Sequence, residues 1–158
     1  MATDGEFRRQ VIMGKNNIDF LAEFNQLYKK MDEIYHLYAK RMGISDTTFW
    51  LLYSLYESNY AYTQRELCAD WHYPPQTVNS ALKNLEKQGI ITLEPVPGNQ
   101  KNKQIILTEA GKELSLKVIS PLVSAEQRTF QEMKEDREYF LAATRDYVDI
   151  LQDEIGKI

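Results

Sequence analysis

A set of short polar side chains between Pro75 and Gln88 is the part of this chain best suited to chemistry. Val78, Leu82 and Leu85 are spaced four and three residues apart, so in a helix they form one apolar stripe. The opposite face carries hydrogen-bonding groups and one cation, from Gln76, Thr77, Asn79, Ser80, Lys83 and Asn84. Amide side chains of this kind pair with adenine edges in the DNA major groove. The pattern therefore indicates a base-reading helix, although an ordinary solvated helix face would look similar on its own.

A second, shorter helix is expected directly before this one. Thr63 and Glu66 have the spacing of a capping box, in which each side chain satisfies a free backbone donor at the helix start. Tyr73 precedes a proline and resists helical dihedrals, so the helix should end before it. Pro75 suits the first position of the next helix, and Gly89 suits the left-handed residue that ends it. Two helices joined by so tight a turn predict a helix-turn-helix.

A β-hairpin is expected after the second helix. Apolar residues at 90–93 and 105–107 predict two strands, and the segment EPVPGNQKNK between them predicts a loop rich in turn formers. Lys101 and Lys103 would project from this loop, or from the start of the second strand, toward phosphates. Two lysines in a hairpin loop are most often solubility charges. Beside a polar helix they indicate the wing of a winged helix-turn-helix.

Two helices are also expected before the helix-turn-helix. Apolar residues recur every three or four positions over residues 17–42, which predicts a long amphipathic helix that Gly43 ends. Ser45 and Asp46 should cap the next helix. Its sequence, TTFWLLYSLYES, is apolar on most sides, so we expect it to be buried.

Two further helices should follow the hairpin. Beyond Gly111 an apolar pattern continues through Val118 and Val123, and Pro121 predicts a kink or a break within it. The last helix is expected over residues 136–155, with an apolar stripe of its own. The predicted fold class is mainly α with a small β-hairpin wing, that is, a winged helix-turn-helix flanked by long dimerisation helices.

These flanking helices carry more apolar surface than the winged region can cover. A two-fold dimer would bury the excess, and it would place two base-reading helices about 34 Å apart to meet successive major grooves of a pseudo-palindromic operator. We therefore expect residues 1–44 and 112–158 to form a dimerisation region and residues 45–111 a DNA-binding region, intertwined as one domain. A monomeric helical bundle with a satellite domain is the alternative.

The order of these elements is similar to that of the MarR (multiple antibiotic resistance regulator) family. The most specific matching pieces are TVNSALKNLEKQGII and LTEAG, and the resemblance spans nearly the whole chain. It implies a cytoplasmic bacterial transcription regulator that is homodimeric and releases DNA when a small ligand or oxidant binds. The family pattern puts the base-reading positions on Gln76, Thr77, Asn79, Ser80, Lys83 and Asn84.

Two positions depart from the family pattern. The family often has an arginine where this chain has Ser80. Its wing usually carries Asp-x-Arg-Asp-x-Arg, whereas this wing reads VPGNQK and leaves Lys101 as the nearest cation.

Two features are candidates for sensing a signal. Cys68 is the only thiol, and some members of the family sense oxidants through cysteine. Here the cysteine falls in the apolar stripe of a helix. A buried thiol in apolar surroundings is inert, so a structural role is favoured. A pocket for an aromatic effector is expected where the first two helices meet the lobe after the hairpin. Its predicted lining is Tyr35, Tyr38, Trp50, Tyr53 and Tyr56. Such rings suit a phenolic ligand, although aromatics at helical spacing commonly form core.

The charge of the chain bears on its partner. The net charge is −4, but residues 63–112 carry six basic and five acidic side chains, so the winged region has a charge of +1 against −5 elsewhere. The sign favours DNA, and the small size predicts modest affinity that depends strongly on salt. The alternative is a winged helix that recognises another protein without contacting DNA, through an exposed apolar patch.

Enzyme, metal and membrane classes fit the sequence poorly. His36 and His72 are the only histidines and lie in different elements, so a four-ligand zinc site cannot be assembled. Neither a glycine-rich phosphate loop nor a GxSxG nucleophile is present, and we expect no catalysis, metal or cofactor. No apolar run approaches the roughly 20 residues of a membrane span, and no signal peptide is apparent. With one cysteine there is no internal disulfide, which agrees with the cytoplasm.

Overall fold

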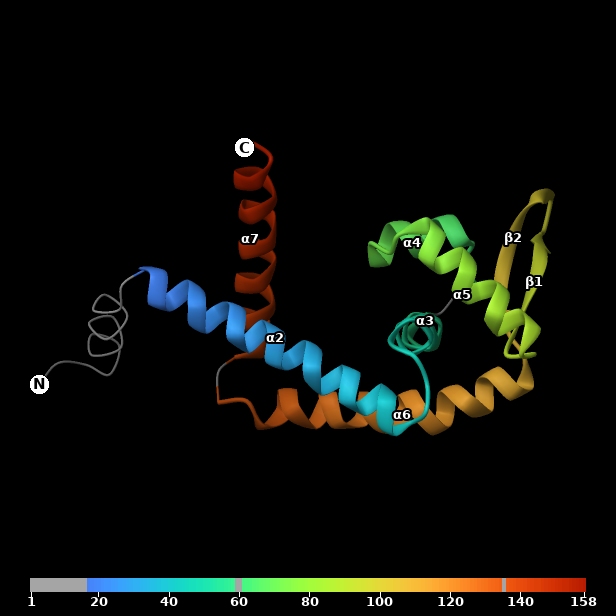
Figure 1. Ribbon diagram of the computed structural model, residues 1–158, viewed down its shortest axis with the longest axis horizontal. Coiled ribbons are helices and arrows are strands. Elements are labelled where there is room, and N and C mark those ends of the chain that lie inside the picture. Colours follow the sequence, from blue (N-terminus) through green and yellow to red (C-terminus); the bar gives the residue numbers. More distant parts are fainter. Residues whose placement is uncertain (1–16, 59–60, 135) are drawn as a thin grey trace, which may run out of the picture.

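The computed structural model (Figure 1) describes residues 17–58, 61–134 and 136–158. The elements are α2 (Asn17–Arg41), α3 (Asp46–Glu57), α4 (Gln64–Trp71), α5 (Pro75–Lys87), β1 (Ile91–Val96), β2 (Asn99–Leu107), α6 (Glu109–Glu132) and α7 (Arg137–Ile155). Over these ranges the fold is mainly helical with one antiparallel hairpin, which confirms the predicted fold class. Residues 1–16, which the predicted dimerisation region includes, lie outside the described residues.

Helix α3 is the centre of the arrangement, because it contacts α2, α5 and α6. In Figure 1 it is seen end-on, with α4, α5 and the hairpin on one side and the long helices α2 and α6 on the other. Helix α7 stands away from the winged region. The helix-turn-helix thus packs against α3 through α5, and α3 packs against α2 and α6.

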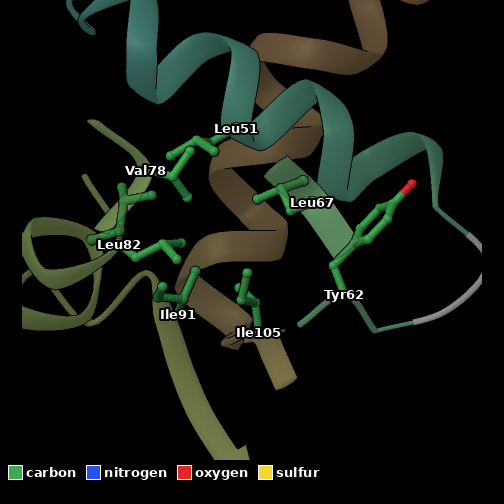
Figure 2. Close-up of a cluster of buried hydrophobic side chains, with 8 residues drawn as sticks. Leu51, Tyr62, Leu67, Val78, Leu82, Ile91 and Ile105 are labelled. Atoms are coloured by element: carbon green, nitrogen blue, oxygen red, sulfur yellow. The ribbon is translucent and has the colours of Figure 1, made fainter. Parts of the chain in front are cut away.

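The burial of α3 explains why its sequence is apolar on most sides. Leu51 enters a core with residues of α4, α5 and both strands, as Figure 2 shows. Phe49 and Leu52 enter a second core with Ala39 of α2 and with residues of α6. All three side chains of α3 are fully buried, and each contributes about 1.5–3 kcal/mol when taken out of water. Helix α3 therefore links the winged region to α2 and α6 by contributing to both cores.

The end of α2 and the start of α3 have residues that favour helix termination and capping. Gly43 has φ +75°, the left-handed conformation that ends a helix. Ser45 is the N-cap of α3, and its hydroxyl accepts a hydrogen bond from the backbone N–H of Thr48 at 3.2 Å. Asp46, predicted to share the cap, is the first helical residue instead, and its carboxylate lies 2.8 Å from Nδ1 of His36.

Helix α6 is continuous through Pro121, so the break allowed for at this residue does not occur. Its ribbon changes direction along its length in Figure 1. A proline inside a helix leaves the carbonyl four residues earlier without a donor. Here both Pro121 and Lys117, which carries that carbonyl, are exposed. Water can bind the freed oxygen, so the helix tolerates the proline.

The hairpin is longer and tighter than the sequence suggested. Strand β1 pairs with β2 in antiparallel register from Ile91↔Leu107 to Pro95↔Lys103, with an irregularity after Pro95. Most of the segment 94–103, predicted to be a loop, belongs to the two strands. Only positions 97 and 98 form the turn, and the other turn-forming residues of the segment lie in the paired strands. The turn is centred on Gly98, whose φ of +78° only glycine adopts readily.

Candidate nucleic-acid interface

Helix α4 begins with the predicted capping box. The hydroxyl oxygen of Thr63 accepts from the backbone N–H of Glu66 at 3.3 Å, and Oε2 of Glu66 accepts from the backbone N–H of Thr63 at 2.8 Å. Because these hydrogen bonds stabilise the charged carboxylate, the pKa of Glu66 is lowered. The helix ends before Tyr73 as expected, at His72, which adopts the left-handed conformation with φ +53°.

The turn between α4 and α5 is tied to α3 and to α4. The hydroxyl of Tyr73 donates to the carbonyl oxygen of Trp50 at 3.2 Å and lies 3.1 Å from the hydroxyl of Ser54. The Tyr73 ring stacks on Trp71 with centroids 6.4 Å apart. The side-chain amide of Gln64 donates to the carbonyl oxygen of Pro75 at 3.2 Å. These contacts fix the angle at which α5 leaves the turn.

Helix α5 has the predicted bounds and the predicted buried stripe. Val78, Leu82 and Leu85 are at most 2% exposed and face the core around α3 (Figure 2). The polar candidates are all exposed, and they are Gln76, Thr77, Asn79, Ser80, Lys83 and Asn84. At about 100° per residue these six occupy an arc of roughly 160° opposite the stripe. The structure thus gathers them on one outward face, and packing leaves that face free to contact a partner.

The wing carries two of the predicted cations. Lys101 and Lys103 are exposed and lie on strand β2 rather than in a loop. The strand is also paired with the segment before α4, since the backbone N–H of Ile105 donates to the carbonyl oxygen of Tyr62 at 2.7 Å and Thr63 bridges Gln104. The sequence analysis missed this pairing. It makes the wing and the helix-turn-helix one unit.

The LTEAG segment joins the wing to α6. Thr108 is the N-cap of α6, and its hydroxyl donates to the carbonyl oxygens of Gly89 at 2.6 Å and Ile90 at 3.1 Å. Gly111 then packs directly against the backbone, since a Cβ atom built on it would lie 2.1 Å from the carbonyl oxygen of Ile90. The glycine is required by this close approach, which explains the motif that the sequence singled out.

Three of the five aromatic residues predicted to line an effector pocket have hydroxyls that bond to α6. The hydroxyls of Tyr35 and Tyr53 donate to the two carboxylate oxygens of Glu126, at 2.6 and 2.8 Å. The hydroxyl of Tyr38 donates to the carbonyl oxygen of Val118 at 2.7 Å. Burial, reinforced by the carboxylate, raises the pKa of Tyr35. The sequence analysis missed Glu126, because nothing local marks a glutamate on a distant helix as the acceptor of two phenols.

The other two predicted pocket residues also lie against the second core. Tyr56 packs on it, and Trp50 packs on it while lining a hollow of about 160 Å³ between α3 and the start of α5. Thr77 of the polar face lines the same hollow. All five predicted pocket residues, from α2 and α3, therefore pack against the second core.

Cys68 lies on α4 and packs against the first core, as expected of a structural residue, but it is half-buried rather than fully buried. Burial raises the pKa of its thiol. Within the described ranges, no three His, Cys, Asp or Glu side chains are arranged to hold a metal ion. No helix in the same part of the chain has the length and apolar character needed to cross a membrane.

Comparison with known proteins matches the winged region to a family model. Residues 42–101 match the model described as MarR family. No curated protein sequence matches the chain significantly.

Solved structures resemble the whole fold. The MarR family regulator NMB1585 from Neisseria meningitidis has a TM-score of 0.73 at 19% identity, covering 90% of this chain and 99% of its own. A putative MarR family transcriptional regulator from Listeria monocytogenes, complexed with 26mer DNA, has a TM-score of 0.67 at 23% identity, covering 85% and 89%. Sco3205 from Streptomyces coelicolor, a MarR family regulator in complex with DNA, has a TM-score of 0.67 at 20% identity, covering 82% and 84%.

Proposed function

This chain belongs to the MarR family, and from that premise we propose that it is a transcription regulator that binds double-stranded DNA. The family consists of regulators rather than enzymes, so the chain is not an enzyme. Two of the similar structures, from Listeria monocytogenes and Streptomyces coelicolor, contain DNA, which supports the proposal for this chain. As a regulator acting on a bacterial chromosome, the protein would be located in the cytoplasm.

The outward face of α5 is the single observation that carries the proposal. Its amide and hydroxyl groups are exposed, while the opposite side of the same helix is held in the core. Asn79 and Gln76 can pair with adenine through both a donor and an acceptor, and Lys83 lies one turn further along. Lys101 and Lys103 on the adjoining strand would contact phosphates, which adds affinity without sequence choice. This combination fits a helix in the major groove beside a basic wing.

A homodimer follows from the surface of the long helices. Large apolar side chains are exposed along α2 and α7, among them Leu27 at 60%, Ile34 at 57%, Leu141 at 54% and Ile150 at 61%. The rings of Phe24 and Tyr147 are 4.8 Å apart, so α2 and α7 approach each other and their apolar stripes adjoin. Apolar surface of this extent on adjoining helices marks an interface, and self-complementary two-fold pairing is the commonest solution.

In this dimer, residues 1–44 and 112–158 form the dimerisation region and residues 45–111 the DNA-binding region of one intertwined domain. The two-fold axis relates the two copies of α5, and a spacing of about 34 Å would let them enter successive major grooves. The preferred operator is then a pseudo-palindrome.

A small aromatic effector would act where Tyr35 of α2 and Tyr53 of α3 meet Glu126 of α6. A phenol entering there would compete with Tyr35 and Tyr53 for the carboxylate of Glu126. Because α3 carries the winged region, a shift of α3 against α6 would change the spacing of the two recognition helices. We propose release of DNA by this route.

Titration of a random-sequence duplex, followed by fluorescence anisotropy at several salt concentrations, tests DNA binding. Saturable, salt-dependent binding is expected, and Lys83→Glu should abolish it. Lys112→Glu is the matched control, because it makes the same charge change on an exposed lysine at the start of α6. Absence of binding by the unaltered chain refutes the proposal. Sedimentation of Leu27→Glu, expected to be monomeric, tests the dimer separately.

A further inference from the structure

A broad groove runs between α4 and strand β2, outside the polar face of α5. Its volume is about 920 Å³. Arg65 and Cys68 line it from α4, His72 lines it from the turn, and Lys101 and Lys103 line it from the strand. Arg65 and His72 were not predicted to bind DNA, because they precede the recognition helix and lie far in sequence from the wing.

The charge of this groove differs from that of the chain. Three basic side chains line it, Arg65, Lys101 and Lys103, and none of the described lining residues is an aspartate or glutamate. The chain as a whole has a net charge of −4. Glu66, which follows Arg65 in the sequence, is hydrogen-bonded to Thr63 at the helix cap. The groove is thus a concentrated site for an anion on an acidic protein.

The two walls of the groove are fixed relative to each other. Strand β2 is bonded to the segment before α4 through the backbone N–H of Ile105 and the carbonyl oxygen of Tyr62, 2.7 Å apart. Helix α4 is bonded to the start of α5 through Gln64 and Pro75. Because both walls are held by hydrogen bonds, the backbone positions that carry the cations are fixed, and ordering on binding is confined to the cationic side chains.

The position of the groove identifies the anion. Pro75, the first residue of α5, lines the groove together with Lys101 and Lys103 of the wing. When α5 lies in a major groove and the wing lies over the adjacent minor groove, one sugar–phosphate strand separates them. That strand must pass between α5 and the wing, and the groove between α4 and β2 adjoins this path at Pro75.

We propose that this groove holds one DNA strand by its phosphates, with Arg65 as a phosphate ligand from α4 opposite Lys101 and Lys103 from the wing. The inference rests on the proposed function and adds Arg65 to the DNA contacts. The guanidinium fork of Arg65 can bind two phosphate oxygens at once. Contacts of this kind set affinity and register and carry no base preference.

Cys68 provides a direct test because it is the only thiol and lines the groove. Alkylation by iodoacetamide is followed by mass spectrometry, at mildly alkaline pH because burial raises the pKa of this thiol. A saturating random-sequence duplex should slow the alkylation several-fold, and high salt that dissociates the duplex should restore the original rate. An unchanged rate while anisotropy reports bound duplex overturns the groove proposal and leaves the proposed function standing.

Substitution of Arg65 gives a second readout. Arg65→Gln should flatten the dependence of log affinity on log salt by about one unit per protomer, equally for every duplex sequence. Arg65→Lys should retain the slope, and Lys112→Gln, which removes a charge outside the groove, should leave it unchanged. An Arg65→Gln slope equal to that of the unaltered chain overturns the role of Arg65. Failure of the unaltered chain to bind any duplex overturns both proposals.

Discussion

The close contact between the wing and α6 predicts how a substitution at Gly111 changes the free energy of unfolding. In Gly111→Ala the new methyl group would lie 2.1 Å from the carbonyl oxygen of Ile90 and 3.1 Å from a methyl group of Leu107. An ordinary contact to that oxygen is about 1 Å longer, so α6 must move away from the hairpin. The same oxygen accepts from the backbone N–H of Thr108 at 3.0 Å and from its hydroxyl at 3.1 Å, and both hydrogen bonds would stretch.

The unfavourable contributions to the stability of Gly111→Ala are larger than the favourable one. Alanine is favoured over glycine inside a helix by about 0.5–1 kcal/mol. Overpacking costs about 1–3 kcal/mol, and two weakened hydrogen bonds cost about 1 kcal/mol each. The free energy of unfolding should therefore fall by about 2–4.5 kcal/mol, although the substitution would be stabilising in an open helix.

Urea unfolding followed by circular dichroism measures this change, at one fixed protein concentration because a dimer's stability depends on it. Gly156→Ala is the matched control, since Gly156 has φ −64° and the added methyl group would meet its nearest atom at 3.2 Å. The control should change the midpoint little. If Gly111→Ala were as stable as the unaltered chain, the close approach at Ile90 would not be what fixes the wing to α6.

Three further predictions concern base reading, affinity and pH. Asn79→Ala or Gln76→Ala should reduce discrimination between a selected duplex and its single-base variants by about 1–3 kcal/mol, measured by competition binding. Lys101→Ala should weaken binding to all duplexes alike and flatten the salt slope, and an effect confined to one sequence would contradict a phosphate contact. The lowered pKa of Glu66 gives stability that is present above the ordinary pKa of glutamate, about 4.3, and is lost as pH falls through the folded value. Glu66→Gln should therefore flatten the acid side of a thermal-unfolding pH profile, and an unchanged profile would count against the capping box with Thr63.

Local signals in the sequence predicted the helix-turn-helix well. The bounds of α4 and α5 could be predicted because the residues that set them act on the backbone only a few positions away. These residues are the capping box of Thr63 and Glu66, Pro75 and Gly89. The burial of Leu82 and its neighbours followed from spacing alone.

What the sequence did not reveal depends on contacts between distant segments. Glu126 meets Tyr35 and Tyr53 only after three helices have packed, and no spacing rule connects them. The hairpin extends to Val96 and Asn99 through pairing between its own strands, and Gln104 also bridges Thr63, which lies far away in the sequence. For the same reason Arg65 joined the candidate DNA interface only when the fold brought α4 beside the wing.

The central claim is that two copies of the α5 polar face read one duplex. Selection of bound duplexes from a random pool by the purified chain tests it most directly. The account predicts enrichment of an inverted repeat whose half-site centres are about one helical turn apart, 10–10.5 base pairs. Enrichment of a single unrepeated site would contradict the two-fold arrangement, and a pool that stays random would contradict base reading by α5 altogether.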